Sequence, residues 1–288
     1  MNYQAKVERI NCPLCNNRNH SVWAEENGFF AVKCSECGLI YINPRPLSSL
    51  INEAVKYGVH RNVNHGRTAI SRRIGTKVKL YRKIISTIFA DVWASKKMIS
   101  WLDVGAGYGE IIEAVSLIAT SGSKVEGIEP MRPKVIKAKK LGISIKECYL
   151  SEITEKYDFV SLINVFSHIP DFREFLKDIK KVLKLNGEFF LETGNTGDLV
   201  NYQLVPSELD LPDHLVFASE RNIIDYLNEA GFSIIAIYRR REDGITNFLK
   251  NIIKKILGRK VLLKPPYSSP YRSLLIRAKL RGSNNNDL

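Results

Sequence analysis

Two sets of residues in this 288-residue sequence have types and spacings suited to chemistry: four early cysteines and a glycine-rich loop with acidic neighbours. The cysteines form two Cys-x2-Cys pairs, Cys12 with Cys15 and Cys34 with Cys37, with 18 residues between the pairs. This spacing is typical of a zinc ribbon, in which four thiolates hold Zn²⁺ tetrahedrally and leave no position open for water. We therefore predict a structural metal. The alternative is four unligated cysteines, although so short a segment would hardly fold without a metal.

The glycine-rich loop follows an apolar stretch that ends at Val104. Gly105, Gly107 and Gly109 form a G-x-G-x-G pattern before a predicted helix, and such glycines let the backbone approach a ligand closely. The dinucleotide-binding fingerprint needs its third glycine where Glu110 stands, and a carboxylate is a poor neighbour for a pyrophosphate. The pattern favours a ligand without a pyrophosphate. The alternative is a tight turn with no ligand.

Acidic residues lie on both sides of this loop. Asp103 precedes it, and Glu129 ends the next predicted strand, 20 residues beyond Gly109. A carboxylate at that place accepts hydrogen bonds from both ribose hydroxyls in doubly wound folds. S-adenosylmethionine has a ribose, no phosphate, and cationic sulfonium and amino groups that suit acidic neighbours. We therefore predict adenosylmethionine as the cofactor.

Short apolar runs alternate with helical patterns after residue 98. Several runs are almost continuously apolar, which is typical of parallel strands buried on both faces of a sheet. Two more strand candidates follow later in the chain. The predicted strands cover residues 98–104, 124–128, 143–147, 157–163, 187–193, 232–239 and 271–279.

The prolines of Asn43-Pro44-Arg45-Pro46 resist helix and indicate a domain boundary near residue 46. We expect three parts and a polar tail. They are a zinc-ribbon module over residues 1–46, a basic helical bridge over 47–97, a catalytic domain over 98–281 and a disordered tail over 282–288. An amphipathic helix is expected over residues 245–258.

From about residue 98 to 239 the sequence resembles the class I S-adenosylmethionine-dependent methyltransferases. The resemblance is carried by the glycine loop, by Gly127-Ile128-Glu129-Pro130, by Tyr157-Asp158-Phe159-Val160 leading to Asn164, and by segments 166–171 and 183–191. The family implies a Rossmann-like α/β fold, a doubly wound sheet of seven mostly parallel strands whose last strand runs antiparallel. It also implies that Gly105, Gly107 and Gly109 approach the cofactor, that Glu129 binds its ribose, and that Asn164 lies under its methionine portion.

The same resemblance locates the adenine pocket just after the third strand. In this sequence that place reads Cys148-Tyr149-Leu150, so Leu150 is the implied contact. The acidic residue that is usual there in the family is missing from this sequence.

The segment that ends at Pro46 resembles the N-terminal ribbon of many bacterial methyltransferases of sugar and surface-polysaccharide pathways. This implies a sugar or related small metabolite as methyl acceptor, free or linked to a lipid. A hydroxyl or carbon acceptor needs a base. His168, four residues beyond Asn164, and His214, in a loop between the fifth and sixth strands, are the two candidates. The alternative for His168 is a cap on the next helix.

The charge balance favours anionic partners, because 43 Lys and Arg against 30 Asp and Glu give a net charge of +13. The amphipathic stretch carries Lys250, Lys254 and Lys255 beside an apolar face. Such a helix either lies on an anionic membrane or packs on the protein itself. The sequence has neither a signal-peptide core at its start nor an apolar run of about 18 residues. We therefore expect a cytoplasmic protein, with peripheral membrane contact as an option.

Two rival functions remain open at this point. One is an RNA methyltransferase whose ribbon and basic bridge grip phosphates, and the other is a non-catalytic protein that binds adenosylmethionine. Enzymes that methylate base amino groups carry Asn/Asp-Pro-Pro-Tyr after the fourth strand, where this sequence has Asn164-Val165-Phe166-Ser167. Nucleic acid is therefore the less favoured substrate.

Overall fold

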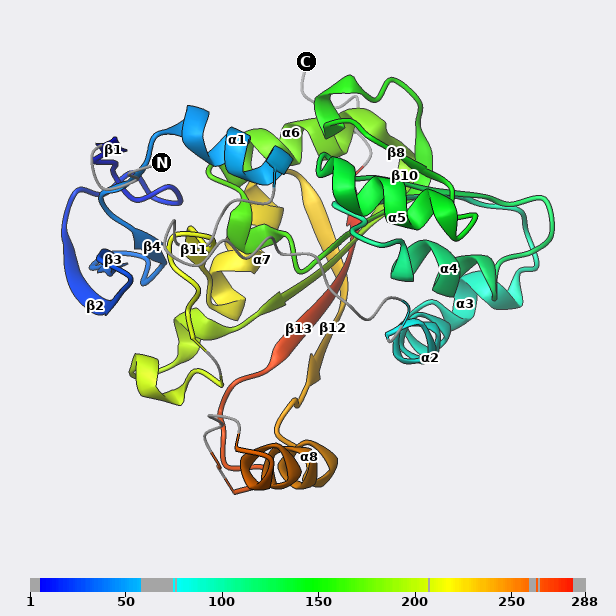
Figure 1. Ribbon diagram of the computed structural model, residues 1–288. Helices are drawn as coiled ribbons and strands as arrows, with labels where there is room; N and C mark the ends of the chain where they lie inside the picture. Colours follow the sequence, from blue (N-terminus) through cyan, green and yellow to red (C-terminus); the bar gives the residue numbers. More distant parts are fainter. Residues whose placement is uncertain are drawn as a thin grey trace, which may run out of the picture.

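The structure, a computed structural model, describes residues 6–57, 75, 77–206, 208–258, 263 and 265–281. Its centre is a twisted sheet of seven strands with helices packed on both faces (Figure 1). The strand order across the sheet is β12-β13-β10-β9-β6-β7-β8. The strands are β6 (Ser100–Val104), β7 (Lys124–Ile128), β8 (Ile145–Lys146), β9 (Tyr157–Ile163), β10 (Leu183–Gly194), β12 (Phe232–Arg240) and β13 (Ser273–Leu280).

The strand directions confirm the predicted doubly wound sheet. β10, β9, β6, β7 and β8 pair in parallel, whereas β13 is antiparallel to both of its neighbours, β10 and β12. All seven predicted strands form close to their expected positions. β10 begins earlier than expected, at Leu183, because a shift in register between Leu183 and Glu188 lets both ends of the segment pair with β9.

The two faces of the sheet carry different helices. On one face, Phe89 packs edge-on against Trp101, Phe159 and Phe190, beneath α2 (Val78–Ile88), α3 (Ala90–Ala94) and α4 (Glu110–Ser116). On the other face, α6 (Phe172–Val182) and α7 (Glu220–Glu229) cover the core. α5 (Arg132–Lys140) packs beside β8. The carboxyl ends of β6, β7 and β9 meet at one edge of the sheet, where ligands bind in open α/β folds.

The N-terminal module is joined to the rest of the chain through a second sheet. Its strands β2 (His20–Glu26), β3 (Phe29–Cys34) and β4 (Ile40–Ile42) are extended by β11 (Val216–Phe217), which pairs antiparallel with β4. A separate pair joins β1 (Val7–Glu8) to β5 (Arg45–Pro46). The module's buried residues belong to the same core as α6 and α7.

The expected bridge contains three helices in its described part. It contains α1 (Ser48–Tyr57) together with α2 and α3, while residues 58–74 and 76 lie outside the described part of the chain. The tail over residues 282–288 also lies outside it. The predicted amphipathic helix forms as α8 (Ile245–Ile256), between β12 and β13. No helix in the described ranges has the length and apolarity that crossing a bilayer requires.

Candidate active site

A cavity of about 480 Å³ opens at the carboxyl edge of the sheet, within the range usual for small-ligand sites. We call it the large cavity. It brings together four of the predicted cofactor residues, which come from the ends of β6, β7 and β9 and from the loop after β8: Gly105, Glu129, Leu150 and Asn164. Asp103, Gly107 and Gly109 do not contact the large cavity directly. Of these three residues, Gly107 is tied to the wall by the hydrogen bond that its amide donates to Glu129.

Glu129 ties the glycine loop to the end of β7. Its Oε2 accepts a hydrogen bond from the Gly107 amide at 2.8 Å, and its Oε1 accepts one from the Met131 amide at 3.0 Å. The carboxylate is almost fully buried, and it lies in the wall of the large cavity. A carboxylate can accept about four hydrogen bonds, so these two amides leave capacity for a ligand's hydroxyls.

Glycine is required at two positions of the loop. Gly105 has φ +69°, and a Cβ added there would lie 2.6 Å from a methyl carbon of Val165. Gly109 has φ +83°, and its Cβ would lie 2.5 Å from a methyl carbon of Ile143. A side chain at either position would be both strained and in collision. Close packing of the loop against neighbouring segments therefore explains two of the three glycines.

Asp103 is buried beneath the loop at the end of β6. Its Oδ1 accepts a hydrogen bond of 2.6 Å from the Ser161 hydroxyl on β9. Burial raises the pKa of Asp103 to about 7, with a smaller contribution in the same direction from the Glu129 carboxylate and an opposing one from the Ser161 hydrogen bond. The sheet thus holds a carboxyl group behind the cavity that titrates near neutral pH.

Much of the large cavity is apolar, and part of its wall comes from a helix that the sequence did not assign to the site. α1 contributes Ile51, Asn52 and Val55 to the same lining as Ile128 and Leu150. The sequence pattern indicated a helix in this region but gave no sign of which surface it covers. An apolar chamber with a carboxylate at one side fits an adenosine, because the flat faces of its base pack against apolar side chains and its ribose carries hydroxyls.

A second cavity of about 130 Å³, which we call the small cavity, lies next to the large one and shares Asn164 with it. Asn164 adopts a left-handed backbone conformation with φ +57°. Its backbone amide donates a hydrogen bond to the backbone carbonyl of Glu192 at 2.9 Å. The wall of the small cavity is mainly polar. It includes Ser167, Thr193, Thr196, Glu208, His214 and Tyr271.

The two predicted histidines meet at the boundary between these cavities. His168 lines the large cavity, His214 lines the small one, and their ring centroids are 4.7 Å apart. The alternative role of His168 as a helix cap is wrong, because the Asp171 side chain accepts the hydrogen bond from Glu174 that caps α6.

The hydrogen bonds of the histidines fix which ring nitrogen carries the hydrogen. Nδ1 of His214 lies 2.7 Å from the Leu209 carbonyl, and Nδ1 of His168 lies 2.9 Å from the Asp213 carbonyl. Because a carbonyl oxygen only accepts, Nδ1 is the donor in each neutral ring, and Nε2 carries a lone pair. Burial lowers the pKa of His214, and the nearby His168 lowers it further. His214 is therefore neutral near pH 7 and can accept a proton at Nε2.

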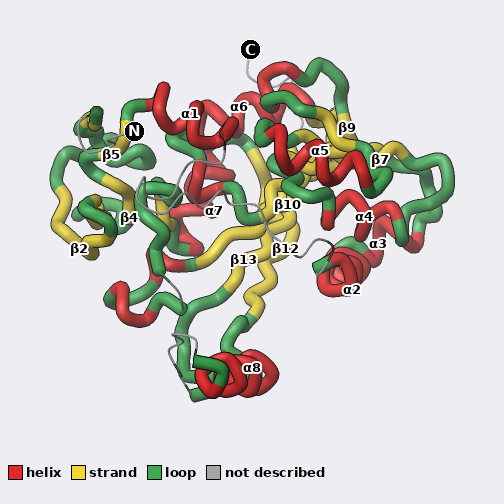
Figure 2. Tube along the Cα trace, viewed as in Figure 1, coloured by secondary structure: helices red, strands yellow, loops and turns green. Residues whose placement is uncertain are grey.

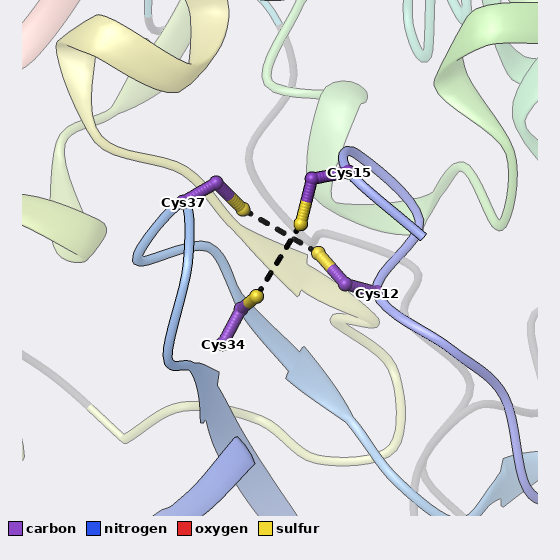
Figure 3. Close-up of side chains that lie close together, drawn as sticks. All are labelled: Cys12, Cys15, Cys34 and Cys37. Carbon is purple, nitrogen blue, oxygen red and sulfur yellow. Dashed lines mark hydrogen bonds between the residues drawn. The ribbon is translucent and has the colours of Figure 1, made fainter. Parts of the chain in front are cut away.

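The four cysteines of the N-terminal module point toward a common centre (Figure 3). Their Sγ atoms all lie within 4.8 Å of one another, and the Cys12–Cys37 and Cys15–Cys34 pairs are each 3.5 Å apart. In a tetrahedral site with metal–sulfur bonds of about 2.3 Å, the sulfurs are roughly 3.8 Å apart. The Cys37 thiol also lowers the pKa of Cys12 to about 5. Both the donor set and its spacing fit a metal ion.

The cysteine module holds the loop that carries His214. Besides the β4–β11 pairing, the Ile42 amide donates to the Leu215 carbonyl at 2.9 Å. The Glu26 carboxylate accepts hydrogen bonds from the Leu209 and Leu211 amides, at 2.8 and 3.0 Å. Sequence reasoning missed Glu26, because 183 residues separate it from Leu209 and it has no motif of its own.

Residues 73–237, more than half of the chain, match a family described as a methyltransferase domain. The chain belongs to the class I adenosylmethionine-dependent methyltransferases. This confirms the family expected from the glycine loop and from the segments after β7 and β9.

Curated relatives match the methyltransferase over part of its length. A ubiquinone biosynthesis O-methyltransferase of Pseudoalteromonas translucida is 26% identical over 153 residues, which cover 47% of this chain and 64% of that protein. The protein of the same name from Pseudomonas savastanoi is 30% identical over 112 residues, covering 35% of this chain and 46% of that protein. The match spans less than two thirds of each of these relatives.

Solved structures share the fold of the methyltransferase. Magnesium protoporphyrin IX methyltransferase from Synechocystis, with bound adenosylhomocysteine, has a TM-score of 0.50 at 14% identity and covers 81% of this chain and 99% of that one. An adenosylmethionine-dependent methyltransferase from Archaeoglobus fulgidus also has a TM-score of 0.50, at 16% identity, with coverage of 70% and 94%. At such identities the likeness establishes the fold.

Proposed function

We propose that this methyltransferase transfers a methyl group to a hydroxyl oxygen of a sugar or a related small, hydroxyl-rich metabolite. The main support for this proposal is the small cavity. It adjoins the large cavity at Asn164, its volume of about 130 Å³ suits a small acceptor group, and hydroxyl, carboxylate and imidazole side chains gather in its wall. Oxygen is favoured as the acceptor atom because the curated relatives are named O-methyltransferases.

In this proposal the large cavity holds the cofactor. The Glu129 carboxylate accepts the ribose hydroxyls, Leu150 lines the adenine site, and Asn164 lies beside the methionine portion, at the boundary with the small cavity. Bound adenosylmethionine supplies an electrophilic methyl group. The protein then has to hold the acceptor oxygen in line and remove its proton, since a leaving thioether needs no acid.

We assign the proton transfer to His214. Its Nδ1 is held as a donor to the Leu209 carbonyl, so that Nε2 can take the acceptor's hydroxyl proton as the new carbon–oxygen bond forms. Because burial lowers the pKa of His214 below its usual 6.5, the ring remains a base at neutral pH. The reaction rate is expected to fall as the pH drops through that lowered pKa.

We also propose that the four thiolates hold one structural Zn²⁺. Four sulfur donors favour zinc over hard cations, and they leave no open position for a substrate or a reactive water. The role of the metal is then to fix the module that supports the His214 loop.

The test is transfer of labelled methyl from adenosylmethionine to nucleotide sugars, lipid-linked sugars and RNA. We expect label on a sugar, and we expect His214→Ala to reduce kcat by about a hundredfold or more while cofactor affinity is kept. His168→Ala measures the contribution of the neighbouring ring. Label on RNA alone, or full activity of His214→Ala, would contradict the proposal.

A further inference from the structure

α8 stands apart from the helices that cover the central sheet. Figure 1 shows it at the far end of β12 and β13, and Figure 2 shows the short loop that joins β12 to it. Its base is anchored by hydrogen bonds from the Tyr267 amide to the Asp243 carbonyl and from the Ser269 amide to the Asp243 carboxylate. No described side chain of α8 is buried. Phe248 and Ile252 on one side of the helix are half-buried, so the protein itself covers only part of the apolar face.

A stripe of large apolar side chains on α8 faces solvent. Ile245, Leu249, Ile253 and Ile256 follow one another at helical spacing and are 53%, 52%, 56% and 79% exposed. Leu257, just beyond the helix, is 70% exposed. A single exposed aliphatic residue is ordinary on a protein surface, but a continuous apolar stripe of three turns indicates a partner.

Cationic side chains border this stripe. Lys250, Lys254 and Lys255 are exposed, and residues 245–258 include no acidic residue. On a helical projection Lys250 and Lys255 fall on opposite margins of the apolar arc. When the apolar side chains of such a helix are buried at the boundary between headgroups and acyl chains, lysines at both margins hold their charges at the level of the lipid headgroups.

We propose that α8 docks the protein on the surface of an anionic lipid bilayer, lying flat with its apolar stripe in the interface. The alternative partner for the apolar stripe is a second copy of this chain. Pairing two stripes would bring two sets of three lysines together on proteins that each have a net charge of +13. Repulsion disfavours that pairing, whereas anionic headgroups complement the same charges. The proposal does not depend on which acceptor the enzyme methylates.

The experiment measures co-sedimentation of the full-length protein with vesicles of phosphatidylcholine alone and of phosphatidylcholine mixed with phosphatidylglycerol. Binding is expected only to the mixed vesicles and should weaken as salt is added. Because each lysine near an anionic surface contributes about a factor of five, Lys250→Glu, Lys254→Glu and Lys255→Glu together should weaken binding at least about a hundredfold. A second variant, Leu249→Asp with Ile253→Asp, removes the apolar contact and should also release the protein.

The matched control reverses three exposed lysines elsewhere, Lys83, Lys139 and Lys140, so that both triple variants have the same net charge. This control should bind vesicles nearly as well as the parent, and all variants should keep adenosylmethionine binding. Equal binding by the parent and the α8 triple variant would overturn the proposal. So would sedimentation velocity that shows a dimer which Leu249→Asp with Ile253→Asp converts to a monomer.

Discussion

At the scale of single residues, the buried carboxyl of Asp103 leads to a prediction about protonation. Its carboxyl is buried beneath the glycine loop, and this burial raises its pKa to about 7, so that the ligand-free protein at neutral pH contains both protonation states. Adenosylmethionine brings a sulfonium and an ammonium group. A cation near a carboxyl favours its ionised form and therefore lowers its pKa.

We expect adenosylmethionine binding to release a proton from Asp103. If the cofactor moves this pKa well below 7, about half a proton is released per cofactor at pH 7, and almost none above about pH 9, where the carboxyl is already ionised. Calorimetry in buffers of different ionisation enthalpy measures the number of protons released.

Asp103→Asn is the control, because it removes the titrating group without changing the size of the side chain. Proton release that persists in this variant would show that another group titrates on binding.

Several candidate site residues could be predicted individually, because a short local sequence pattern indicates the chemistry of each. The G-x-G-x-G loop, the acid at the end of the next strand and the cysteine pairs are of this kind. The contact between the rings of His168 and His214 could not be predicted, since 46 positions separate the two residues and only the fold brings them together.

At the scale of elements, the cysteine module and the His214 loop act as one unit. β11 has only two residues and forms because β4 offers it a free strand edge. The Glu26 carboxylate adds two hydrogen bonds to backbone amides of the loop, and bonds of this kind to a charged acceptor are among the stronger ones in proteins. Metal bound to the cysteines should therefore affect catalysis without touching the substrate.

If the cysteines hold a metal, we expect its removal by a chelator to lower kcat more strongly than it lowers adenosylmethionine affinity. The physical reason is displacement of the His214 loop, since a misplacement of about 1 Å at a reacting group can cost roughly a hundredfold in rate. Activity assays and calorimetry on the same samples separate the two effects, and elemental analysis gives the metal content.

Glu26→Ala should act in the same direction with the metal still bound, whereas Glu26→Gln should keep part of the activity because its amide oxygen still accepts. Equal loss of cofactor affinity and activity in these samples would show general unfolding instead.

The strands of the central sheet were predictable because buried parallel strands are short apolar runs separated by helical patterns. Two features of the site were not. β11 is too short to show the alternation of apolar and polar residues that indicates a strand. α1 shows a helical pattern, but the pattern does not reveal which surface the helix covers. The part of the large cavity formed by the strand ends was therefore predictable, whereas the part formed by α1 was not.

At the scale of the whole molecule, the N-terminal module and the catalytic domain share a hydrophobic core. Cys12, Leu14 and Tyr41 from the module belong to the same buried cluster as Phe172 and Tyr226 from α6 and α7. The chain changes from strand to helix near residue 46, where the domain boundary was expected. The buried side chains of the N-terminal module nevertheless pack directly against those of the catalytic domain.

We expect the metal-loaded protein to unfold in a single calorimetric transition, because opening one part exposes core residues of the other. The van't Hoff and calorimetric enthalpies should agree, and adenosylmethionine should shift the whole transition to higher temperature. A chain that lacks residues 1–46 should unfold at a lower temperature or aggregate. Two separate transitions, only one of them shifted by the cofactor, would show independent units.

The position of β13 sets the order in which the sheet can be assembled. β13 lies between β10 and β12, and it follows both of them in the sequence. As the nascent chain leaves the ribosome, β10 therefore presents a bare edge until β13 is inserted, and β12 has no partner strand at all. Premature termination near residue 270 would remove an interior strand and cut the sheet in two. Nonsense or frameshift changes so late in the gene should thus be as damaging as early ones.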